Sequence, residues 1–347
     1  MTSNAPLGWA LIGASTVAGD HMIPAIRAVP GNRVVGILSS SLERGRRYAA
    51  ANDIPLVYHS LDDALSDPAV GVAYISTTND RHAAEACAAA RAGRHVLCEK
   101  PLATRLDDAR TMLATAREAG VVLATNHHLR STAPLIALRD ALAGGAIGEP
   151  LAARVFHAKY LPPPLQGWRL QRPEAGAGVV LDLTVHDADT LRFLLREDPV
   201  EVTAMATNQG LALDGVEDGV MGVMRFPSGV LASFHDAFTI RNAPTGLEIH
   251  GAEGSLIGRN VLGPGPIGDL ILRRGGFETV VNVGGGEDPY EHTVRRFADA
   301  VRGTGTPTAS GWDGVWSLAV ALAVSESART GRAISLAVGA DGPGAGA

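Results

Sequence analysis

The feature of this sequence that most constrains its fold is an alternation of short apolar runs with amphipathic segments between Trp9 and Asn126. The apolar runs are WALIGA, RVVGILSS, PLVYH, VAYIST, HVLCEK and VVLATN. They lack polar alternation, which is typical of parallel strands in a sheet that helices cover on both faces. Residues 1–126 are therefore predicted to form a doubly wound α/β domain that binds ligands at the carboxyl ends of its strands.

The pattern changes after Asn126, and residues 127–337 are predicted to form a second α/β domain. A Pro-rich loop is expected over 161–178 and a helix over 184–196, followed by five strand-like segments separated by turn signals such as PSG and AEG. These segments predict an open, mainly antiparallel sheet. Two helical stretches precede residues 338–347, which have too little apolar side chain to fold and are predicted to be a disordered tail.

Composition and charge exclude several classes of protein. The 347 residues include 30 basic and 36 acidic side chains with the two signs mixed, so no basic surface for nucleic acid or anionic lipid is expected. The two cysteines, Cys87 and Cys98, have neither disulfide-framework nor metal-site spacing. No apolar run approaches the roughly 20 residues that span a bilayer, and the N-terminus lacks a signal-peptide pattern. A cytoplasmic protein is expected.

The segment Gly13-Ala-Ser-Thr-Val-Ala18 lies between the first predicted strand and a helix. In this context a Gly-rich turn presents backbone N–H groups and a helix N-terminus to a phosphate. Gly13 fits the tight turn, and Ser15 and Ala18 replace the other two glycines with residues small enough for a dinucleotide-binding loop. A plain strand-to-helix turn is the alternative, because the motif is weak on its own.

The second predicted strand ends in SSSLER, where an NAD-binding fold usually carries an acidic residue that binds the adenosine ribose. Ser39 and Ser40 can donate hydrogen bonds to a 2′-phosphate, and Arg44 can pair with it through two parallel bonds. Glu43 is expected to face solvent. The segment favours NADP over NAD, and the alternative is that these are ordinary helix-start and surface residues.

Lys100 follows the fifth predicted strand and precedes Pro101, which disfavours a helix at the lysine and so directs it toward the ligand edge of the sheet. Beside a nicotinamide ring, an ammonium group can bind a substrate carbonyl and donate a proton as hydride arrives, provided that its pKa is moved toward neutrality. A Glu-Lys pair before proline also fits an exposed turn, because lysine is mostly exposed. A catalytic role for Lys100 therefore requires partner residues.

Such partners occur in the run VLDLTVHDAD. Thr184 and Asp187 have the spacing of a capping box that starts a helix, with His186 in the first turn and Asp182 just before it. His186 can bind a substrate hydroxyl or relay a proton, and Asp182 can orient it or bind the substrate. Asp187 is assigned to capping and Asp189 to solvent. The alternative is that His186 is a satisfied structural residue and Asp182 an ordinary loop carboxylate.

Metal binding is a further alternative for one aspartate and several histidines, namely His127, His128, His157, His186 and Asp182. No HExxH motif or other tight ligand spacing supports such a site. No metal is therefore expected.

Six segments occur in order along the chain: GASTVA, SSSLER, VLCEKP, TNHH, LQGWRLQRPEAGAGVVLDLTVHDADTLRF and EIHGAEGSLIGRN. In these segments the chain resembles the glucose-fructose oxidoreductase/inositol dehydrogenase/MocA (Gfo/Idh/MocA) family over nearly its whole length. The resemblance implies an N-terminal Rossmann dinucleotide-binding domain, a C-terminal α/β domain built on an open antiparallel sheet, and an active site between them.

The resemblance also implies roles for individual residues. Lys100 matches the catalytic lysine of the family, and Asp182 and His186 match its substrate-binding aspartate and catalytic histidine. The positions that match cofactor contacts are Gly13, Ala14, Ser15, Thr16, Ala18, Ser39, Ser40, Arg44, Thr77, Thr78, Asn79, Asp80, Arg81, His82, Glu99, Lys100, Asn126, Trp168, Arg169 and Tyr290. Without the resemblance, Trp168 and Arg169 fit a surface cation–π pair, and Tyr290 fits a core residue at a helix start.

Together with these residues, the resemblance implies an enzyme that uses NADP(H) to reduce the ketone of a cyclic, polyhydroxylated sugar derivative. Lys100 would protonate the new alkoxide, while Asp182 and His186 would bind neighbouring hydroxyl groups. The alternatives are an NAD(P)-dependent dehydrogenase of inositol or another sugar polyol, and a non-catalytic NADP-sensing regulator. The expected partner is a small sugar ketone, without nucleic acid or membrane, and the chain is expected to be a monomer or a homo-oligomer through its outer sheet face.

Overall fold

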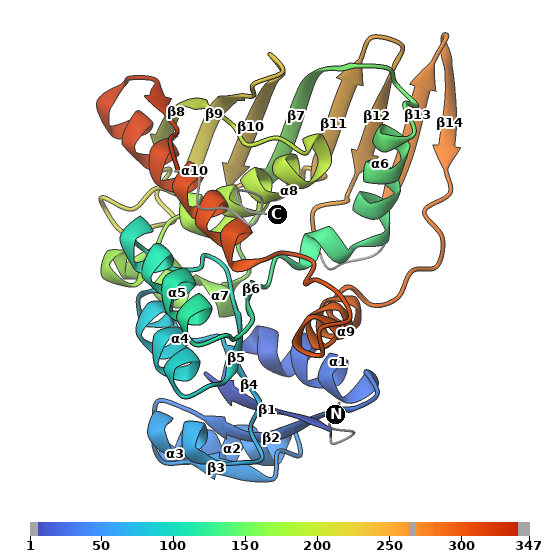
Figure 1. Ribbon diagram of the computed structural model, residues 1–347. Helices are drawn as coiled ribbons and strands as arrows, with labels where there is room; N and C mark the ends of the chain where they lie inside the picture. Colours follow the sequence, from blue (N-terminus) through green and yellow to red (C-terminus); the bar gives the residue numbers. More distant parts are fainter. Residues whose placement is uncertain (1–5, 264–267, 339–347) are drawn as a thin grey trace. The chain divides into compact units, whose positions relative to one another are not determined.

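The computed structural model describes residues 6–263 and 268–338 of the chain (Figure 1). The chain forms two compact units, and each is described by itself. Unit 1 comprises residues 1–128 and 287–315, and unit 2 comprises 129–286 and 316–347. The segment 287–315, which the sequence assigns to the second domain, thus groups with the first. Most of the expected tail at 338–347 lies outside the described residues.

Within the described residues, unit 1 contains a six-stranded parallel sheet with the strand order β3-β2-β1-β4-β5-β6 (Figure 1). The strands are β1 Leu7–Ile12, β2 Asn32–Leu38, β3 Leu56–Tyr58, β4 Val72–Ile75, β5 His95–Cys98 and β6 Leu123–Thr125. Each corresponds to one of the apolar runs, so the predicted doubly wound fold is confirmed. The order reverses between β1 and β4, and ligands of such sheets bind at this switch point.

The helices of unit 1 are the π-helical turn Ala18–Met22, α1 Ile23–Ala28, α2 Leu42–Ala51, α3 Leu61–Ser66, the 3-10 turn Asn79–Arg81, α4 His82–Arg91, α5 Leu106–Glu118 and α9 Pro289–Val301. Serine side chains begin two of them. The Ser41 hydroxyl accepts the backbone N–H of Arg44 at the start of α2, and Ser60 caps α3 in the same way. Such caps satisfy backbone donors that a helix start leaves unpaired.

Helix α9 completes the core of unit 1, although it is far from the other elements in the sequence. Its residues Val294 and Phe297 are fully buried with the side chains of β1 and α1. The ring of Phe297 lies 5.4 Å from that of Trp9 in β1. The first 128 residues therefore share their hydrophobic core with a segment that follows the second domain in sequence.

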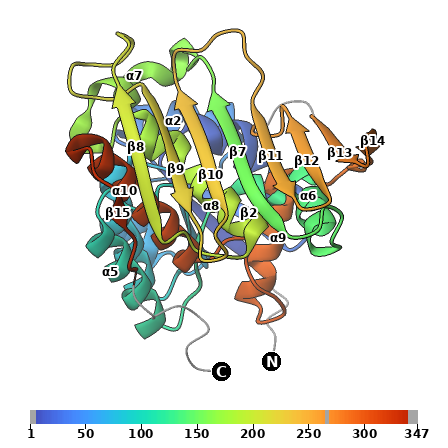
Figure 2. The same ribbon diagram turned by 90° about the horizontal axis from the view of Figure 1, so that it is seen from above.

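The sheet of unit 2 has nine strands in the described part of the chain, in the order β14-β13-β12-β11-β7-β10-β9-β8-β15 (Figure 2). The strands are β7 Pro150–Ala158, β8 Glu201–Thr207, β9 Gly219–Arg225, β10 Leu231–Ala237, β11 Gly246–Gly251, β12 Gly254–Arg259, β13 Asp269–Arg274, β14 Phe277–Val281 and β15 Ile334–Ser335. The pair β7–β10 is parallel and its neighbours pair antiparallel. A mainly antiparallel sheet is therefore confirmed, and β13, β14 and β15 are strands that the sequence did not predict.

The two faces of this sheet differ. Helices α6 Ala133–Ala143 and α8 Val185–Leu195 lie behind the sheet in the view of Figure 2. The opposite face carries exposed apolar side chains on three neighbouring strands: Met205, Met221, Val223 and Leu231. An oligomer formed through this face stays a prediction.

The Pro-rich stretch 161–178 is helical for much of its length, so the prediction of a loop there was wrong. It contains α7 Pro163–Gln171 and a 3-10 turn, Pro173–Ala175. Proline is tolerated in the first turn of a helix, because the N–H that it lacks would have no partner there. The helix expected at 184 also begins earlier, with a π-helical turn at Val180–Thr184 that runs directly into α8.

Two further helical elements, the 3-10 turn His128–Ser131 and α10 Gly311–Thr330, each contain the boundary between the two units in sequence. Among the residues that the structure describes, no helix is both long enough and apolar enough to cross a membrane.

We expect Phe297→Ala to lower the free energy of unfolding by about 3–5 kcal/mol, because it empties a fully buried site between α9 and β1. Urea unfolding monitored by circular dichroism measures this loss. Phe277→Ala is the matched control, since it makes the same change at a side chain in β14 that is 78% exposed. Equal losses in the two variants would show that α9 is not part of the core of unit 1.

Candidate active site

The turn after β1 requires glycine at its first position. Gly13 has a φ of 115°, and a Cβ atom there would lie 2.8 Å from the backbone of Ser76, which follows β4. A side chain is excluded by both the conformation and the contact. The turns after β1 and β4 therefore lie in close contact. Further along the β1 turn, Ser15 and Thr16 retain exposed surface, as a phosphate-binding turn needs.

Ser15 and Ala18 hold the start of the following helix. The Ser15 hydroxyl donates to Ser76 Oγ at 2.8 Å and accepts the backbone N–H of Ala18 at 3.2 Å. The methyl group of Ala18 is fully buried in the core. Both side chains thus shape the turn, and a direct contact of either with a cofactor stays a prediction.

The end of β2 places a guanidinium group against this turn. Arg44 Nη2 donates to the carbonyl oxygen of Ala14 at 2.8 Å. The Ser39 hydroxyl is buried and has no hydrogen-bond partner among the described residues, which fits a group that a bound ligand would complete. Glu43 is 81% exposed and faces Arg47, so the expectation that it faces solvent is confirmed. The donors at 39 and 44 suit a phosphate.

The loop after β4 is tied to the loop that carries Lys100. The Thr77 hydroxyl donates to Glu85 Oε2 at 2.6 Å, and Arg81 pairs with the same carboxylate at 2.7 Å. The ring of His82 is fully buried, with Nδ1 2.9 Å from the carbonyl oxygen of Pro101 and Nε2 3.2 Å from that of Thr77. His82 therefore joins the two loops from inside.

Three neighbours of His82 were predicted to contact the cofactor as well. Thr78 and Asp80 retain exposed surface, whereas Asn79 is buried. The contacts of these three residues with a cofactor stay predictions.

Glu99 brings a buried carboxylate to the end of β5, directly before Lys100. Its Oε1 atom accepts the hydroxyl of Tyr74 and the side-chain amide of Asn126, each at 2.6 Å. Burial raises the pKa of Glu99, while the two hydrogen bonds and the charge of Lys100 lower it. Asn126 is itself fully buried, so in this structure it orients Glu99. The backbone on either side of Lys100 is thus held by buried polar contacts.

Tyr290, at the start of α9, is buried between two imidazole rings. It stacks on His21 at 4.6 Å and on His128 at 4.9 Å, with interplanar angles of 6° and 12°. Burial raises the pKa of its hydroxyl above the usual range. This burial fits a core residue at a helix start, and its predicted cofactor contact remains a prediction. No local pattern in the sequence indicates this stack, because it joins three distant segments.

In unit 2, Asp182 and His186 lie on one continuous helical segment. Asp182 is in the π-helical turn and His186 is in the first turn of α8, four residues later. That spacing places two side chains on the same side of a helix. Asp182 Oδ1 is 3.5 Å from the guanidinium of Arg169, which also covers the ring of Trp168 at 4.8 Å. Unit 2 thus brings its predicted site residues together. The cation–π pair that was the alternative for Trp168 and Arg169 is present, and their predicted cofactor contact stays a prediction.

The capping box predicted for Thr184 and Asp187 was wrong. The helix is continuous through Thr184, so no free helix start exists there for a side chain to cap. Asp187 and Asp189 are 0% and 1% exposed, which also excludes the solvent position assigned to Asp189. Asp189 forms two hydrogen bonds of 2.8 Å with Arg130 of the turn before α6. The sequence around α8 does not indicate that the turn before α6 covers Asp189.

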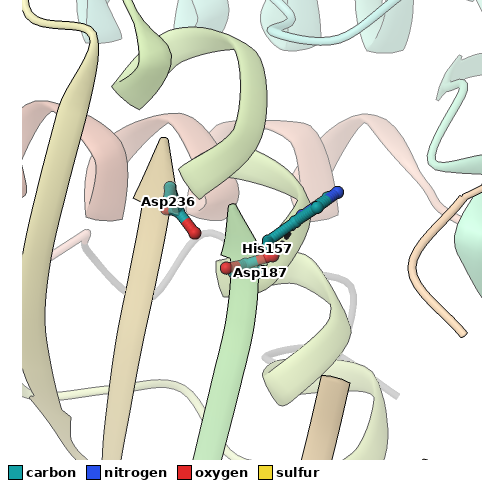
Figure 3. A group of neighbouring side chains, drawn as sticks. All are labelled: His157, Asp187 and Asp236. Carbon is teal, nitrogen blue, oxygen red and sulfur yellow. Dashed lines mark hydrogen bonds and ion pairs between the residues drawn. The ribbon is translucent and has the colours of Figure 1, made fainter. Parts of the chain in front are cut away.

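Asp187 instead belongs to a buried cluster with His157 of β7 and Asp236 of β10 (Figure 3). His157 Nδ1 lies 2.8 Å from Asp187 Oδ1, and the Thr184 hydroxyl donates to Asp236 Oδ2 at 2.5 Å. One potential ligand atom from each of the three residues lies within 4.8 Å of the others, close enough to surround a cation. His157 was considered only as a metal ligand, and Asp236 was missed. Polar residues at inward positions of two apolar strands were the available signal.

Comparison with known proteins identifies the family. The model of an oxidoreductase family with an NAD-binding Rossmann fold matches residues 7–127, and that of the Gfo/Idh/MocA C-terminal domain matches 135–257. A 1,5-anhydro-D-fructose reductase from Ensifer adhaerens is 56% identical over 334 residues, which cover 95% of this chain and 99% of that protein. The chain belongs to the Gfo/Idh/MocA family.

Two solved structures of sugar oxidoreductases match 95% of this chain. An aldose-aldose oxidoreductase from Caulobacter crescentus complexed with glycerol has a TM-score of 0.88 at 25% identity, covering 95% of this chain and all of that one. A levoglucosan dehydrogenase in complex with NADH and levoglucosan has a TM-score of 0.84 at 25% identity, covering 95% and 99%. The predicted family, the Rossmann fold and the assignment as an oxidoreductase are therefore confirmed.

We expect Tyr74→Phe to cost about 1–3 kcal/mol of unfolding free energy, because it removes a donor from the buried Glu99 carboxylate. That hydrogen bond stabilises the ionised carboxyl, so its contribution is lost as pH falls through the raised pKa. Urea unfolding should therefore show a larger cost at about pH 8 than at about pH 5.

Tyr58→Phe is the control for this prediction. The Tyr58 hydroxyl donates to Asp67, whose pKa is lowered, so that carboxyl is ionised at both pH values. Its cost should not change between them. If Tyr74→Phe also cost the same at both pH values, Glu99 would not titrate in this range.

Proposed function

We propose that this Gfo/Idh/MocA enzyme uses NADPH to reduce the 2-keto group of 1,5-anhydro-D-fructose, or of a closely related cyclic sugar ketone. The product from the former would be 1,5-anhydro-D-mannitol. The proposal is carried by the 56% identity to the Ensifer adhaerens reductase, which extends over 99% of that protein. Solved relatives bound to glycerol and to levoglucosan support a polyhydroxylated substrate.

The residues of this chain divide the work in the proposed reaction. A bound reduced nicotinamide supplies the hydride that converts the ketone carbon to an alcohol carbon. Lys100, at the carboxyl end of β5, donates a proton from Nζ to the ketone oxygen as negative charge develops there. Asp182, which Arg169 holds from one side, accepts a hydrogen bond from a substrate hydroxyl. His186 binds a neighbouring hydroxyl and relays a proton back to the lysine.

The end of β2 supports NADP(H) as the cofactor. Ser39 and Ser40 replace the carboxylate that usually binds the adenosine ribose in NAD-binding folds. Arg44 lies against the β1 turn through its bond to Ala14, so a 2′-phosphate bound there would meet a guanidinium group. A carboxylate at positions 39 or 40 would instead repel that phosphate.

Turnover of 1,5-anhydro-D-fructose with NADPH, followed by NADPH absorbance and by identification of the alcohol epimer, tests the proposed function. We expect Lys100→Ala to lower kcat by about 10²- to 10⁴-fold with the Kd for NADPH little changed, because the lysine acts on the developing alkoxide. Undiminished turnover in this variant would contradict the mechanism. Faster oxidation of inositol or another polyol with NAD⁺ would favour a polyol dehydrogenase. Absence of turnover with every sugar tested would favour a non-catalytic regulator.

We expect Arg44→Gln to raise the KM for NADPH by roughly 10- to 100-fold, the effect of losing a hydrogen bond to a charged group. The KM for NADH should stay nearly constant, because NADH lacks the 2′-phosphate. Arg47→Gln is the matched control on the same helix, since Arg47 is 75% exposed and faces Glu43. Equal effects of Arg44→Gln on the two cofactors would indicate a loosened β1 turn instead of a lost phosphate contact.

A further inference from the structure

The cluster of His157, Asp187 and Asp236 contains two carboxyl groups in an enclosed site. Each residue is at most 2% exposed. One oxygen of each carboxyl group accepts a hydrogen bond. Asp187 Oδ1 is paired with His157 Nδ1, and Asp236 Oδ2 accepts the Thr184 hydroxyl. The other oxygens, Asp187 Oδ2 and Asp236 Oδ1, meet no donor from any residue that the structure describes.

The two carboxyl groups lie side by side, with an oxygen of each within 4.8 Å of the other, and a hydrogen bond between them would satisfy both. Two carboxylates are both acceptors, so such a bond exists only when one of them carries a proton. A proton on one of the unsatisfied oxygens also satisfies the other. The geometry therefore calls for one proton shared by Asp187 and Asp236, and for one remaining negative charge.

The environment of the two carboxyl groups also favours one proton and one negative charge between them. Burial raises the pKa of Asp187 to about 7 and that of Asp236 well above its usual range. Lys159, which follows β7, lowers the pKa of Asp187, and His157 lowers that of Asp236. For both carboxyl groups burial is the largest cause, so two negative charges side by side are disfavoured in this site.

His186 lies next to this cluster. It precedes Asp187 on α8, and its ring centroid is 6.1 Å from that of His157, within the range of ring contacts. Asp189, the other carboxylate on this part of α8, is already paired with Arg130. Of the carboxylates on α8, Asp187 is thus the one that contacts the His157 ring, and that ring in turn lies beside His186.

We propose that Asp236 carries a proton that it donates to Asp187, and that the resulting Thr184–Asp236–Asp187–His157 chain is a positioning unit for His186. The role of His186 rests on the proposed function, whereas the shared proton does not. Asp187, as the single anion, fixes the tautomer of His157 by accepting its Nδ1–H. Its charge also stabilises a cationic imidazole at His186 when a proton is relayed.

A divalent cation is the alternative occupant of the cluster. The contacts favour the proton, because His157 Nδ1 lies 2.8 Å from Asp187 Oδ1 (Figure 3) and Asp236 Oδ2 accepts the Thr184 hydroxyl. Asp187 Oδ2 and Asp236 Oδ1 are the oxygens of the pair that have no donor among the described residues, and two oxygens fall well short of the coordination shell of a divalent cation. A cation would also need the three ligand atoms to turn toward a common centre.

Two amide variants of identical shape test the positioning role. In Asp236→Asn, the amide N–H can replace the shared proton and its oxygen can accept from Thr184. In Asp187→Asn, the anion beside His157 is lost. We expect Asp187→Asn to lower kcat at least about tenfold more than Asp236→Asn does, to leave the Kd for NADPH unchanged, and to move the imidazole limb of the kcat–pH profile to lower pH. Equal losses would overturn the positioning role. If Asp187→Asn does not fold, His157→Asn replaces it, because it keeps a donor to Asp187 but removes the ring beside His186.

Thermal unfolding without substrate tests the shared proton independently of any activity. A carboxyl whose pKa is raised in the folded protein stabilises it fully below the unfolded pKa, and that stability is lost as pH rises toward the folded pKa, which for Asp236 lies well above its usual range. Asp236→Asn removes the proton-binding site, so the difference in Tm between wild type and this variant should fall as pH rises from about 5 to about 8.

A Tm difference that does not change with pH would overturn the shared proton. A drop in wild-type Tm on addition of EDTA, restored by Mg²⁺ or Mn²⁺, would overturn it in favour of a cation. If the Tm difference falls as expected but the sugar ketone is not reduced, the shared proton stands and the proposed function fails.

Discussion

Parallel pairing of neighbouring strands is the constraint on which both candidate regions depend, because it brings the carboxyl ends of strands to one edge of a sheet. In unit 1 the edge holds Gly13 after β1, Ser39 after β2 and Glu99 after β5. In unit 2 the parallel register of β7 and β10 sets His157 directly beside Asp236. An antiparallel partner for β7 at this position would end at the opposite edge and leave His157 without a carboxyl neighbour.

Buried carboxyl groups hold the loops at the carboxyl ends of the unit 1 strands in place. Glu99 is held by Tyr74 and Asn126, and Glu85 gathers Thr77 and Arg81. Each enclosed carboxyl is costly to leave unsatisfied, so it orders the loops that supply its donors. Several side chains that the sequence predicts as cofactor contacts therefore hold the backbone of these loops in place. A phosphate or nicotinamide bound there would then meet that ordered backbone.

The sequence predicts local structure well in unit 1 and less well in unit 2, for physical reasons. The six parallel strands are apolar throughout, so they are recognisable one at a time. The return of α9 to unit 1 depends on Phe297 packing against Trp9, a contact across almost 300 residues that no local pattern records. Strands β13 and β14 are short, and the exposed Phe277 and Val280 blur their alternation.

The candidate site shows the same division. Lys100, Asp182 and His186 are predicted because their residue types carry recognisable chemistry, and Ser39 and Arg44 because they occupy a known place in the fold. Asp187 was misassigned because its neighbours in sequence fit a helix cap, whereas its neighbours in space are His157 and Asp236. Burial of a charged residue depends on elements that pack against it, and the sequence around Asp187 contains none of them.

The π-helical turn at Val180–Thr184 makes the direction of Asp182 sensitive to chain length. A π turn contains one residue more than the α-helical turn that would replace it. Deletion of one residue between Asp182 and His186 would remove the wider turn and change their spacing from four residues to three, so the two side chains would be directed differently relative to each other. Evolution of this segment is therefore constrained less by which apolar residues it contains than by how many, and gain or loss of a single codon is the step that would reset its geometry.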